Sequence, residues 1–149
     1  YLYLDSGLLL RVLDLDFGGA KPLTELIIAG SEEDFVNKGK LAELSVGWEM
    51  VKNADPRHRY ELFYWENLSK GATSEVDYVM PKNMGILPIE VKSGTSGKMK
   101  SLRLFMQKKN LLVGIRTSLE NFGRLTIEDG EITRIINILP LYAVGRLTK

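Results

Sequence analysis

Two acidic residues and a lysine lie on neighbouring strand-like segments near the middle of the chain, where together they could bind a metal ion. Residues 75–80 and 86–92 have the pattern of β-strands, and residues 82–85 between them have the composition of a tight turn. With the turn centred on its two middle residues, Asp77 lies opposite Glu90 in the resulting hairpin. Like charges that face each other across an antiparallel pair are destabilising, so this pairing needs an explanation.

A divalent cation between the two carboxylates would remove the repulsion. Two unit charges about 4 Å apart repel by about 4 kcal/mol at the effective dielectric near a protein surface. Carboxylates on adjacent strands suit Mg²⁺ or Mn²⁺, and Lys92 would then hold an attacking water or neutralise a phosphate. The same residues also permit a structural interpretation, in which the hairpin face is solvated, the carboxylates splay apart and Glu75 pairs with Lys92.

Composition limits the classes of protein to consider. The 149 residues suit one domain with its own core, and 44% hydrophobic with 26% charged residues is ordinary for a globular protein. The net charge of +1 gives no global attraction for nucleic acid, so such a contact must come from a local patch. The lack of cysteine excludes thiolate metal sites and fits a cytoplasmic protein. No stretch is long and apolar enough to span a bilayer, so we expect no membrane partner.

The order of the expected elements predicts an α/β fold with a mixed sheet. In chain order we expect a strand at residues 1–4, a helix to about residue 13, a helix opened by a capping box at 31 and ending near 52, a strand at 60–65 that is covered on both faces, the hairpin, a helix at 98–109, a strand at 111–118, two short strands around the turn at 129–130, and a strand running into a terminal helix at 136–147. The predicted core consists of apolar strand residues backed by helix residues: Leu62, Tyr64, Val76, Tyr78, Ile89, Val91, Leu112 and Val113, with Leu44, Trp48, Leu102 and Phe105 behind them.

The spacing of Asp77 and the Glu90-Val91-Lys92 tripeptide resembles the PD-(D/E)xK signature of nucleases. The wider segments NKGKLAELSVGWEM, LFYWENLSKGATSEVDYVMPKNMGILPIEVKSG, KSLRLF and IINILPLYAVGRL resemble the uncharacterised nuclease-like domain that follows an AAA-type ATPase module in bacterial and archaeal proteins. The resemblance covers nearly the whole chain and implies a restriction-endonuclease-like mixed sheet flanked by helices. It also implies that residues 1–149 form one nuclease-like domain, with an ATPase and a winged-helix segment preceding Tyr1, and the chain begins without a methionine.

The resemblance assigns roles to four residues. Asp77 and Glu90 match the metal-binding carboxylates, and Lys92 matches the lysine of the signature, so these three are the expected catalytic residues. Glu43 matches a helix glutamate and would be an outer metal ligand. The proline of the signature is replaced by Val76, a departure that is common in this superfamily.

A basic stripe on the helix at 98–109 is the candidate nucleic-acid contact. Lys100, Arg103 and Gln107 share one face of that helix, and Lys98 lies at its start. These side chains could hold a phosphate backbone, although a solvated helix face explains the same pattern. The adjoining GTSGK at 94–98 lacks the spacing of a P-loop, so we expect no ATP site in this chain.

Two functions therefore follow from the sequence. In the first, the domain is a Mg²⁺- or Mn²⁺-dependent DNA phosphodiesterase whose substrate is loaded by the upstream ATPase. In the second, the same fold is a DNA-binding or assembly module without chemistry. The only histidine, His58, supports neither a zinc site nor a Ser-His-Asp triad.

Overall fold

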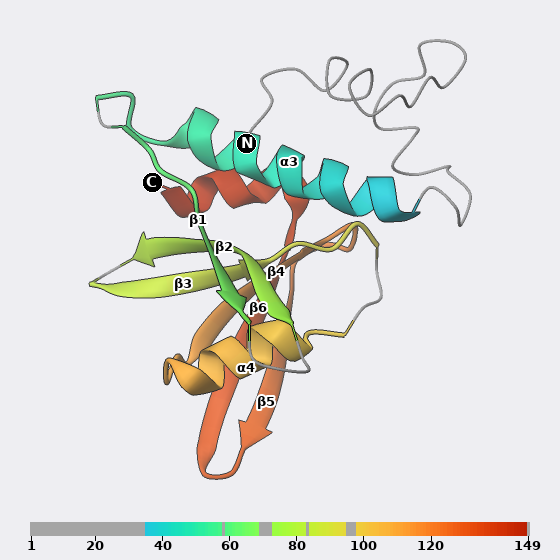
Figure 1. Ribbon diagram of the computed structural model, residues 1–149, viewed down its shortest axis with the longest axis vertical. Helices are drawn as coiled ribbons and strands as arrows, with labels where there is room; N and C mark the ends of the chain where they lie inside the picture. Colours follow the sequence, from blue (N-terminus) through green and yellow to red (C-terminus); the bar gives the residue numbers. More distant parts are fainter. Residues whose placement is uncertain (1–34, 58, 69–72, 83, 95–97, 149) are drawn as a thin grey trace.

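A single six-stranded mixed sheet with helices on both of its faces forms the domain (Figure 1). The computed structural model describes residues 35–57, 59–68, 73–82, 84–94 and 98–148. Its elements in chain order are α3 (Phe35–Asn53), β1 (Phe63–Asn67), β2 (Ser74–Lys82), β3 (Gly85–Glu90), α4 (Lys100–Lys108), β4 (Val113–Ser118), β5 (Gly123–Asp129), β6 (Ile132–Pro140) and the 3₁₀ helix η2 (Leu141–Thr148). The predicted α/β class is confirmed, and the arrangement is compatible with a restriction-endonuclease-like fold.

The strand order is β1-β2-β3-β4-β6-β5, with an antiparallel half and a parallel centre. β1, β2 and β3 are successive antiparallel neighbours, β3 and β4 are parallel, β4 and β6 are parallel, and β5 is antiparallel to β6. Because parallel neighbours need a crossover connection, α4 lies between β3 and β4 in the chain. Gly130 (φ +63°) permits the tight turn between β5 and β6.

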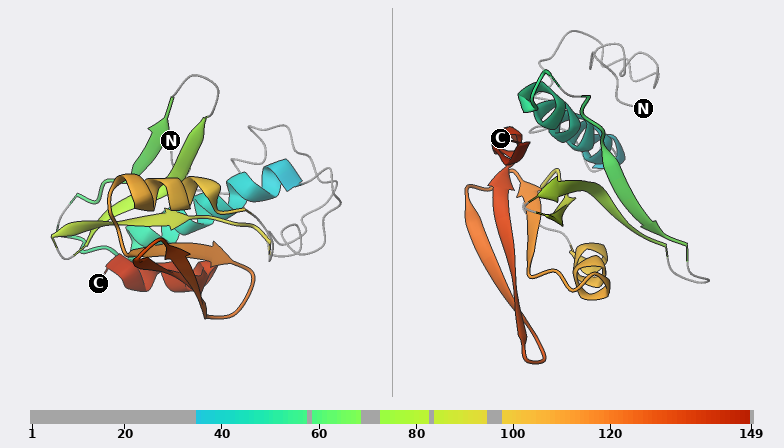
Figure 2. Two further views of the ribbon diagram at one scale, coloured as in Figure 1. Left: turned by 90° about the horizontal axis from the view of Figure 1, so that it is seen from below. Right: turned by 90° about the vertical axis from the view of Figure 1, so that its left-hand side faces the viewer.

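Two apolar clusters hold the helices against opposite faces of the sheet. Figure 2 shows the placement of these helices relative to the strands in two further views. On one face, α3 and η2 pack side by side over the strands, and the buried residues are Ala42, Val46, Met50, Met80, Ile89, Val91, Ile115 and Val144. On the other face, Leu102 and Met106 of α4 pack on Ile136. α4, the helix expected at residues 98–109, is amphipathic because only one of its faces packs on the sheet.

Polar contacts fasten the far end of α4 to the β5–β6 hairpin. Arg134 is buried and donates hydrogen bonds to the carbonyl of Met106 in the last turn of α4 and to that of Leu111, which follows the helix. The Arg134 Nε lies 3.0 Å from Asp129 Oδ2, and the Gln107 amide donates to Asp129 Oδ1 at 3.0 Å. Gln107 is therefore part of a structural network at this end of the helix.

Some predicted core positions are wrong. Tyr64 is 70% exposed and Phe63 is also exposed, because β1 is the edge strand of the sheet and is not covered on both faces. Leu112 and Val113 are exposed at the start of β4, and the buried residues of that strand begin at Gly114. The other predicted core residues are buried or half-buried, namely Leu44, Trp48, Leu62, Val76, Tyr78, Ile89, Val91, Leu102 and Phe105.

The remaining sequence expectations divide into those met and those outside the described residues. The helix that was expected to end near residue 52 ends at Asn53. The strand at 1–4, the helix to residue 13, the capping box at 31 and His58 lie outside the described residues. Among the helices that the structure describes, none is long and apolar enough to cross a membrane.

Candidate metal-binding site

The β2–β3 hairpin has the register predicted from its turn, and it opens at the point where the acidic residues begin. Lys82 pairs with Gly85 and Tyr78 pairs with Ile89, which is the register expected when the turn is centred on the two middle residues of 82–85. The ladder ends at that second pair, and Asp77 and Glu90 are therefore not hydrogen-bonded ladder partners. The prediction that these two carboxylates pair directly is therefore wrong, although the strands bring both residues to the same end of the hairpin.

The Asp77 side chain takes the place of a backbone acceptor where the strands separate. Its Oδ2 accepts a hydrogen bond of 2.6 Å from the backbone N–H of Val91, directly after the end of β3. The next backbone N–H, that of Lys92, donates to the carbonyl of Thr117 at 3.2 Å. Residues 91–92 are therefore held from both neighbouring strands, which fixes the direction in which the Lys92 side chain leaves the backbone.

Glu90 is a buried carboxylate with one oxygen bound and the other without a partner. The residue is only 6% exposed, and its Oε1 lies 2.6 Å from Lys92 Nζ. Within the described part of the chain its Oε2 makes no hydrogen bond. The alternative structural interpretation placed Lys92 beside Glu75, whereas the structure pairs it with Glu90. A buried carboxylate oxygen that lacks a partner is costly, so a site of this kind favours an additional cation or proton.

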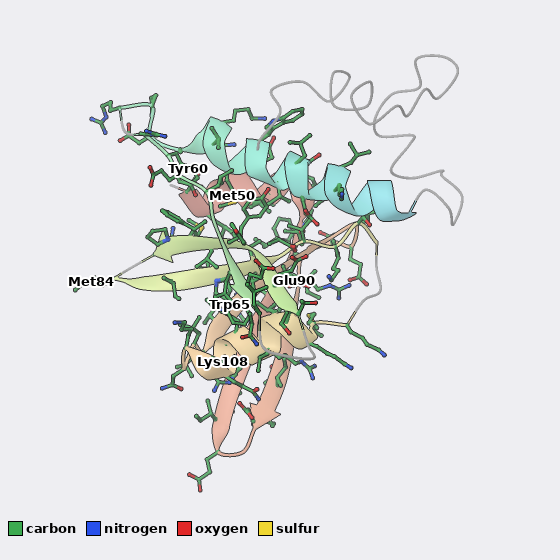
Figure 3. All side chains as sticks on the ribbon, viewed as in Figure 1. Met50, Tyr60, Trp65, Met84, Glu90 and Lys108 are labelled. Carbon is green, nitrogen blue, oxygen red and sulfur yellow. The ribbon has the colours of Figure 1, made fainter. Side chains whose placement is uncertain are left out.

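A cavity of about 540 Å³ joins these groups to the start of both helices. In the view of Figure 3, Glu90 lies between α3 and α4, at the opposite end of the hairpin from Met84 at its tip. The side chains that could do chemistry in the cavity wall are five carboxylates and three lysines: Glu43, Glu66, Glu75, Asp77 and Glu90, with Lys92, Lys98 and Lys100. The hydroxyl residues Thr73, Ser74, Ser93 and Ser101 complete the polar lining. The cavity thus combines hard oxygen ligands with basic groups at its edge.

Burial raises the pKa of three of these carboxylates. The pKa of Asp77 rises to about 7, mainly because the group is desolvated, and the nearby Glu90 and Glu43 charges add to the rise. The Val91 N–H and the Lys92 charge act in the opposite direction. Desolvation is also the main reason why the pKa values of Glu43 and Glu90 are raised, and Lys92 partly offsets the rise for Glu90. Burial therefore favours the protonated form of these carboxylates unless a cation in the cavity offsets their charge.

Glu43 joins the site through its helix position. It lies in α3, is half-buried and lines the cavity. Its backbone carbonyl accepts a hydrogen bond of 2.8 Å from the Tyr78 hydroxyl, which ties this turn of the helix to β2. The structure thus brings together all four residues that the resemblance assigned, Glu43, Asp77, Glu90 and Lys92.

The predicted nucleic-acid stripe is divided between two places. Lys98 and Lys100 line the cavity, at the start of α4. Arg103 is exposed on the same helix and Gln107 is bound to Asp129 at the other end, and neither lines the cavity. Only the first two residues of the stripe are therefore placed beside the carboxylates.

Three charged residues near the site were not among the candidate site residues, although the structural interpretation of the hairpin used Glu75 as a partner of Lys92. Glu66 and Glu75 line the cavity and face each other across the β1–β2 pair. Arg116 is buried on β4 and is the parallel-strand register partner of Glu90, whose pKa its charge lowers. An arginine within the otherwise uncharged run of residues 111–118 was the one signal that could have pointed to it.

The donor chemistry fits a hard divalent cation, but the described side chains are not arranged around one point. Among the residues that the structure describes, no three His, Cys, Asp or Glu side chains are grouped closely enough to hold an ion. Asp77 and the unpartnered Oε2 of Glu90 supply two carboxylates, a number that suffices for Mg²⁺ when waters fill the other positions. An additional carboxylate would have to rotate toward the ion.

Comparison with protein families assigns the chain to a family. A family model described as Domain of unknown function (DUF4143) matches residues 38–143, which include every residue discussed for the cavity. A search of curated proteins returns no match.

Proposed function

We propose that this chain, which belongs to the family described as Domain of unknown function (DUF4143), is a metal-dependent phosphodiesterase domain that acts on DNA. The observation that supports the proposal best is the state of Glu90. It is buried, bound through one oxygen to Lys92, and lies in a cavity shared with Asp77, where its other oxygen has no partner among the residues that the structure describes. Buried carboxylates beside a lysine in a polar cleft are typical of catalytic sites, where burial and neighbouring charges shift the pKa of the reacting groups.

Asp77 and Glu90 would hold the cation, and Glu43 would be a weaker third ligand. Mg²⁺ or Mn²⁺ fits because all three groups offer carboxylate oxygens, which are the donors these ions prefer. When bound, the cation supplies Lewis acidity, which polarises a phosphoryl oxygen and makes a water more acidic. The excess of negative charge in the cavity favours its binding.

The residues of the chain have separate tasks in this proposal. Lys92 orients the attacking water or offsets the charge that develops on the phosphate, and its bond to Glu90 holds it ready. The Val91 N–H fixes the Asp77 carboxylate, so that the second oxygen of this group is directed by the backbone. Lys98 and Lys100 at the edge of the cavity contact the DNA backbone, where charge attracts phosphate without reading sequence.

The sequence resemblance adds an expected partner. A nuclease-like domain that follows an AAA-type ATPase would receive its substrate from that module, and the winged-helix segment would contribute further DNA contacts. ATP hydrolysis then belongs to the ATPase, since the chain has no P-loop spacing at residues 94–98.

A second function, a DNA-binding or assembly module without chemistry, is favoured by one observation. In the described residues the carboxylates do not already surround a single point, whereas many catalytic metal sites are preorganised. In that case Lys92 serves to neutralise the buried Glu90, and no reaction follows.

Cleavage assays separate the two functions. Branched, single-stranded and duplex DNA are incubated with the chain, and with a polypeptide that includes the ATPase, in Mg²⁺, Mn²⁺ or EDTA. We expect cleavage with either metal, none with EDTA, and a loss of at least about 100-fold in Asp77→Asn and Lys92→Ala. The control is Glu131→Gln, an exposed glutamate in the β5–β6 turn, which should retain wild-type activity. DNA binding without any nicking, under all of these conditions, would establish the non-catalytic module.

A further inference from the structure

The edge strand β1 presents a run of three aromatic side chains beside α4. Phe63 is 47% exposed and Tyr64 is 70% exposed, and Trp65 follows them in the chain. The Trp65 ring packs on Phe105 of α4, with ring centroids 4.9 Å apart, and Lys108 Nζ lies 5.6 Å from the centre of the Trp65 ring (Figure 3). Trp65 therefore anchors β1 to α4 and keeps the two exposed rings close to that helix.

The segment that contains α4 carries only positive charge. Residues 98–110 contain five cations and no aspartate or glutamate, and all five side chains are exposed: Lys98, Lys100, Arg103, Lys108 and Lys109. Within the described part of the chain, none of the five forms a salt bridge. Because the whole chain has a net charge of +1, this segment concentrates positive charge along one helix of a nearly neutral domain.

The acidic residues around this surface have other partners or positions. Glu61 lies 3.9 Å from Arg59, before β1 begins, and Glu66 lines the cavity at the other end of the strand. Asp129, near the end of α4, is bound to Arg134. Exposed rings beside such cations are complementary to a polyanion with accessible base faces. They are not complementary to a second copy of the same surface, because its cations would repel these.

We propose that β1 and α4 form a binding surface for single-stranded DNA, in which bases stack on Phe63 and Tyr64 and phosphates contact the cations of α4. Aromatic rings stack on any base and cations follow the backbone, so such a surface binds single strands without reading their sequence. In a duplex the base faces are covered by neighbouring bases, so the rings add nothing to its affinity. The preference for one strand therefore comes from the rings, and the affinity for phosphate comes from the cations.

α4 also connects this surface to the cavity. Lys100 at its start lines the cavity, whereas Lys108 at its end lies over Trp65. Its nine residues extend about 13 Å, the length of about four nucleotides at the B-form rise of about 3.4 Å per strand. A strand that lies along α4 would thus place a base at β1 and a phosphate at the cavity. This last consequence rests on the proposed function, whereas the binding of the strand does not.

Fluorescence anisotropy of labelled oligonucleotides in EDTA, where no metal-dependent cleavage can occur, tests the inference on the intact chain. The probes are a thymidine oligonucleotide of about 15 nucleotides, a duplex of equal length, and an abasic strand that has the same phosphates without bases. We expect the thymidine strand to bind at least about tenfold more tightly than either of the others. Phe63→Ala and Tyr64→Ala should each weaken its binding by at least about fivefold, and should change duplex binding by less than about twofold.

Tyr142→Ala is the matched control, since it removes an equally exposed aromatic ring from η2, which packs beside α3 on the opposite face of the sheet. Its affinity for all three probes should equal that of wild type. Arg103→Gln should weaken the binding of all three probes by a similar factor, because it removes a phosphate contact and leaves the rings in place. Thermal melting verifies that every variant is folded.

The outcomes distinguish this inference from the proposed function. Equal affinity for the thymidine strand and either of the other probes would overturn the inference, because the contact would then be with phosphate alone. Unchanged affinity of Phe63→Ala and Tyr64→Ala would also overturn it, and both results leave the metal site and its cleavage test standing. Single-strand binding that depends on the two rings, together with no cleavage in Mg²⁺ or Mn²⁺, would support this surface and contradict the proposed phosphodiesterase.

Discussion

The carboxylate of Asp77 accepts a 2.6 Å hydrogen bond from the backbone N–H of Val91, at the point where β2 and β3 cease to pair. A side chain thus replaces the backbone acceptor that a continued ladder would supply. The separation of the strands opens the end of the hairpin, and Glu90 and Lys92 face the resulting cavity from the other strand. One hydrogen bond therefore connects the fold of the hairpin to the geometry of the candidate site.

The raised pKa of Asp77 predicts a stability that falls as the pH rises. The folded protein retains the Asp77 proton up to about pH 7, whereas the unfolded chain loses it near its ordinary value of 3.8. The free energy of unfolding should therefore decrease between about pH 4 and pH 7 and then level off. In Asp77→Asn this pH-dependent loss is absent. Between pH 3.5 and pH 8, without metal, the free energy of unfolding of wild type should therefore fall by up to about 4 kcal/mol more than that of the variant. Urea denaturation in EDTA at several pH values measures the difference, and parallel curves for the two proteins would contradict it.

Divalent cations should stabilise the wild-type fold. A ligand that binds only the folded state, at a free concentration 100 times its dissociation constant, adds about 2.7 kcal/mol to the free energy of unfolding. The effect of Mn²⁺ on the melting temperature should be large at pH 8 and smaller at pH 5.5, because protons then compete for Asp77. Asp77→Asn should respond much less at either pH. An equal shift in the variant would show that Mn²⁺ binds elsewhere.

Replacing Lys92 should affect stability as well as activity. Lys92→Ala leaves the buried Glu90 carboxylate without its cation, and we expect a loss of about 1–3 kcal/mol, together with a further rise of the Glu90 pKa. The matched control is Lys52→Ala, which removes an exposed lysine–glutamate pair on α3 and should cost at most about 1 kcal/mol. Chemical denaturation of both variants is the measurement. Equal losses would mean that the Glu90–Lys92 pair behaves as a surface pair.

DNA affinity should separate the two ends of the predicted basic stripe. Lys100 lines the cavity, so Lys100→Gln should weaken binding uniformly across sequences and reduce the salt dependence by about one phosphate contact. Gln107→Ala should leave DNA affinity unchanged and lower the melting temperature, because Gln107 is bound to Asp129. Fluorescence anisotropy at several salt concentrations tests both variants. A weaker DNA affinity of Gln107→Ala would instead show that Gln107 contacts DNA.

Two glycine substitutions should have opposite effects on stability. A Cβ added to Gly114 would lie 2.8 Å from Met106 Sδ and 3.4 Å from Leu102 Cδ1, so Gly114→Ala should cost about 1–3 kcal/mol through overpacking. A Cβ on Gly39 meets nothing within 4 Å in α3, so Gly39→Ala should stabilise the helix by about 0.5–1 kcal/mol. Thermal and urea unfolding test both. Destabilisation by Gly39→Ala would indicate a contact that the free space does not reveal.

The hairpin and the meeting of Asp77, Glu90 and Lys92 were determined by the sequence itself. Both depend on local physics, since the turn sets the register and the period of two along a strand sets which side chains share a face. The helix residues that face the sheet were equally predictable, because Leu102, Phe105 and Met106 recur at helical spacing.

Only the tertiary structure decided which strand became an edge and which charges became partners. Tyr64 is of a residue type that favours buried strands, and it is exposed because its side chain lies on a face of the edge strand β1 that no helix or strand of the described residues covers. Lys92 binds Glu90 and not Glu75, because β3 leaves the ladder before that pair can form. Glu66 lines the cavity because β1 pairs with β2, and β1 lies outside the signature residues 77–92. These outcomes depend on which faces of the sheet are covered and on where each strand stops pairing, and local periodicity contains no information about either.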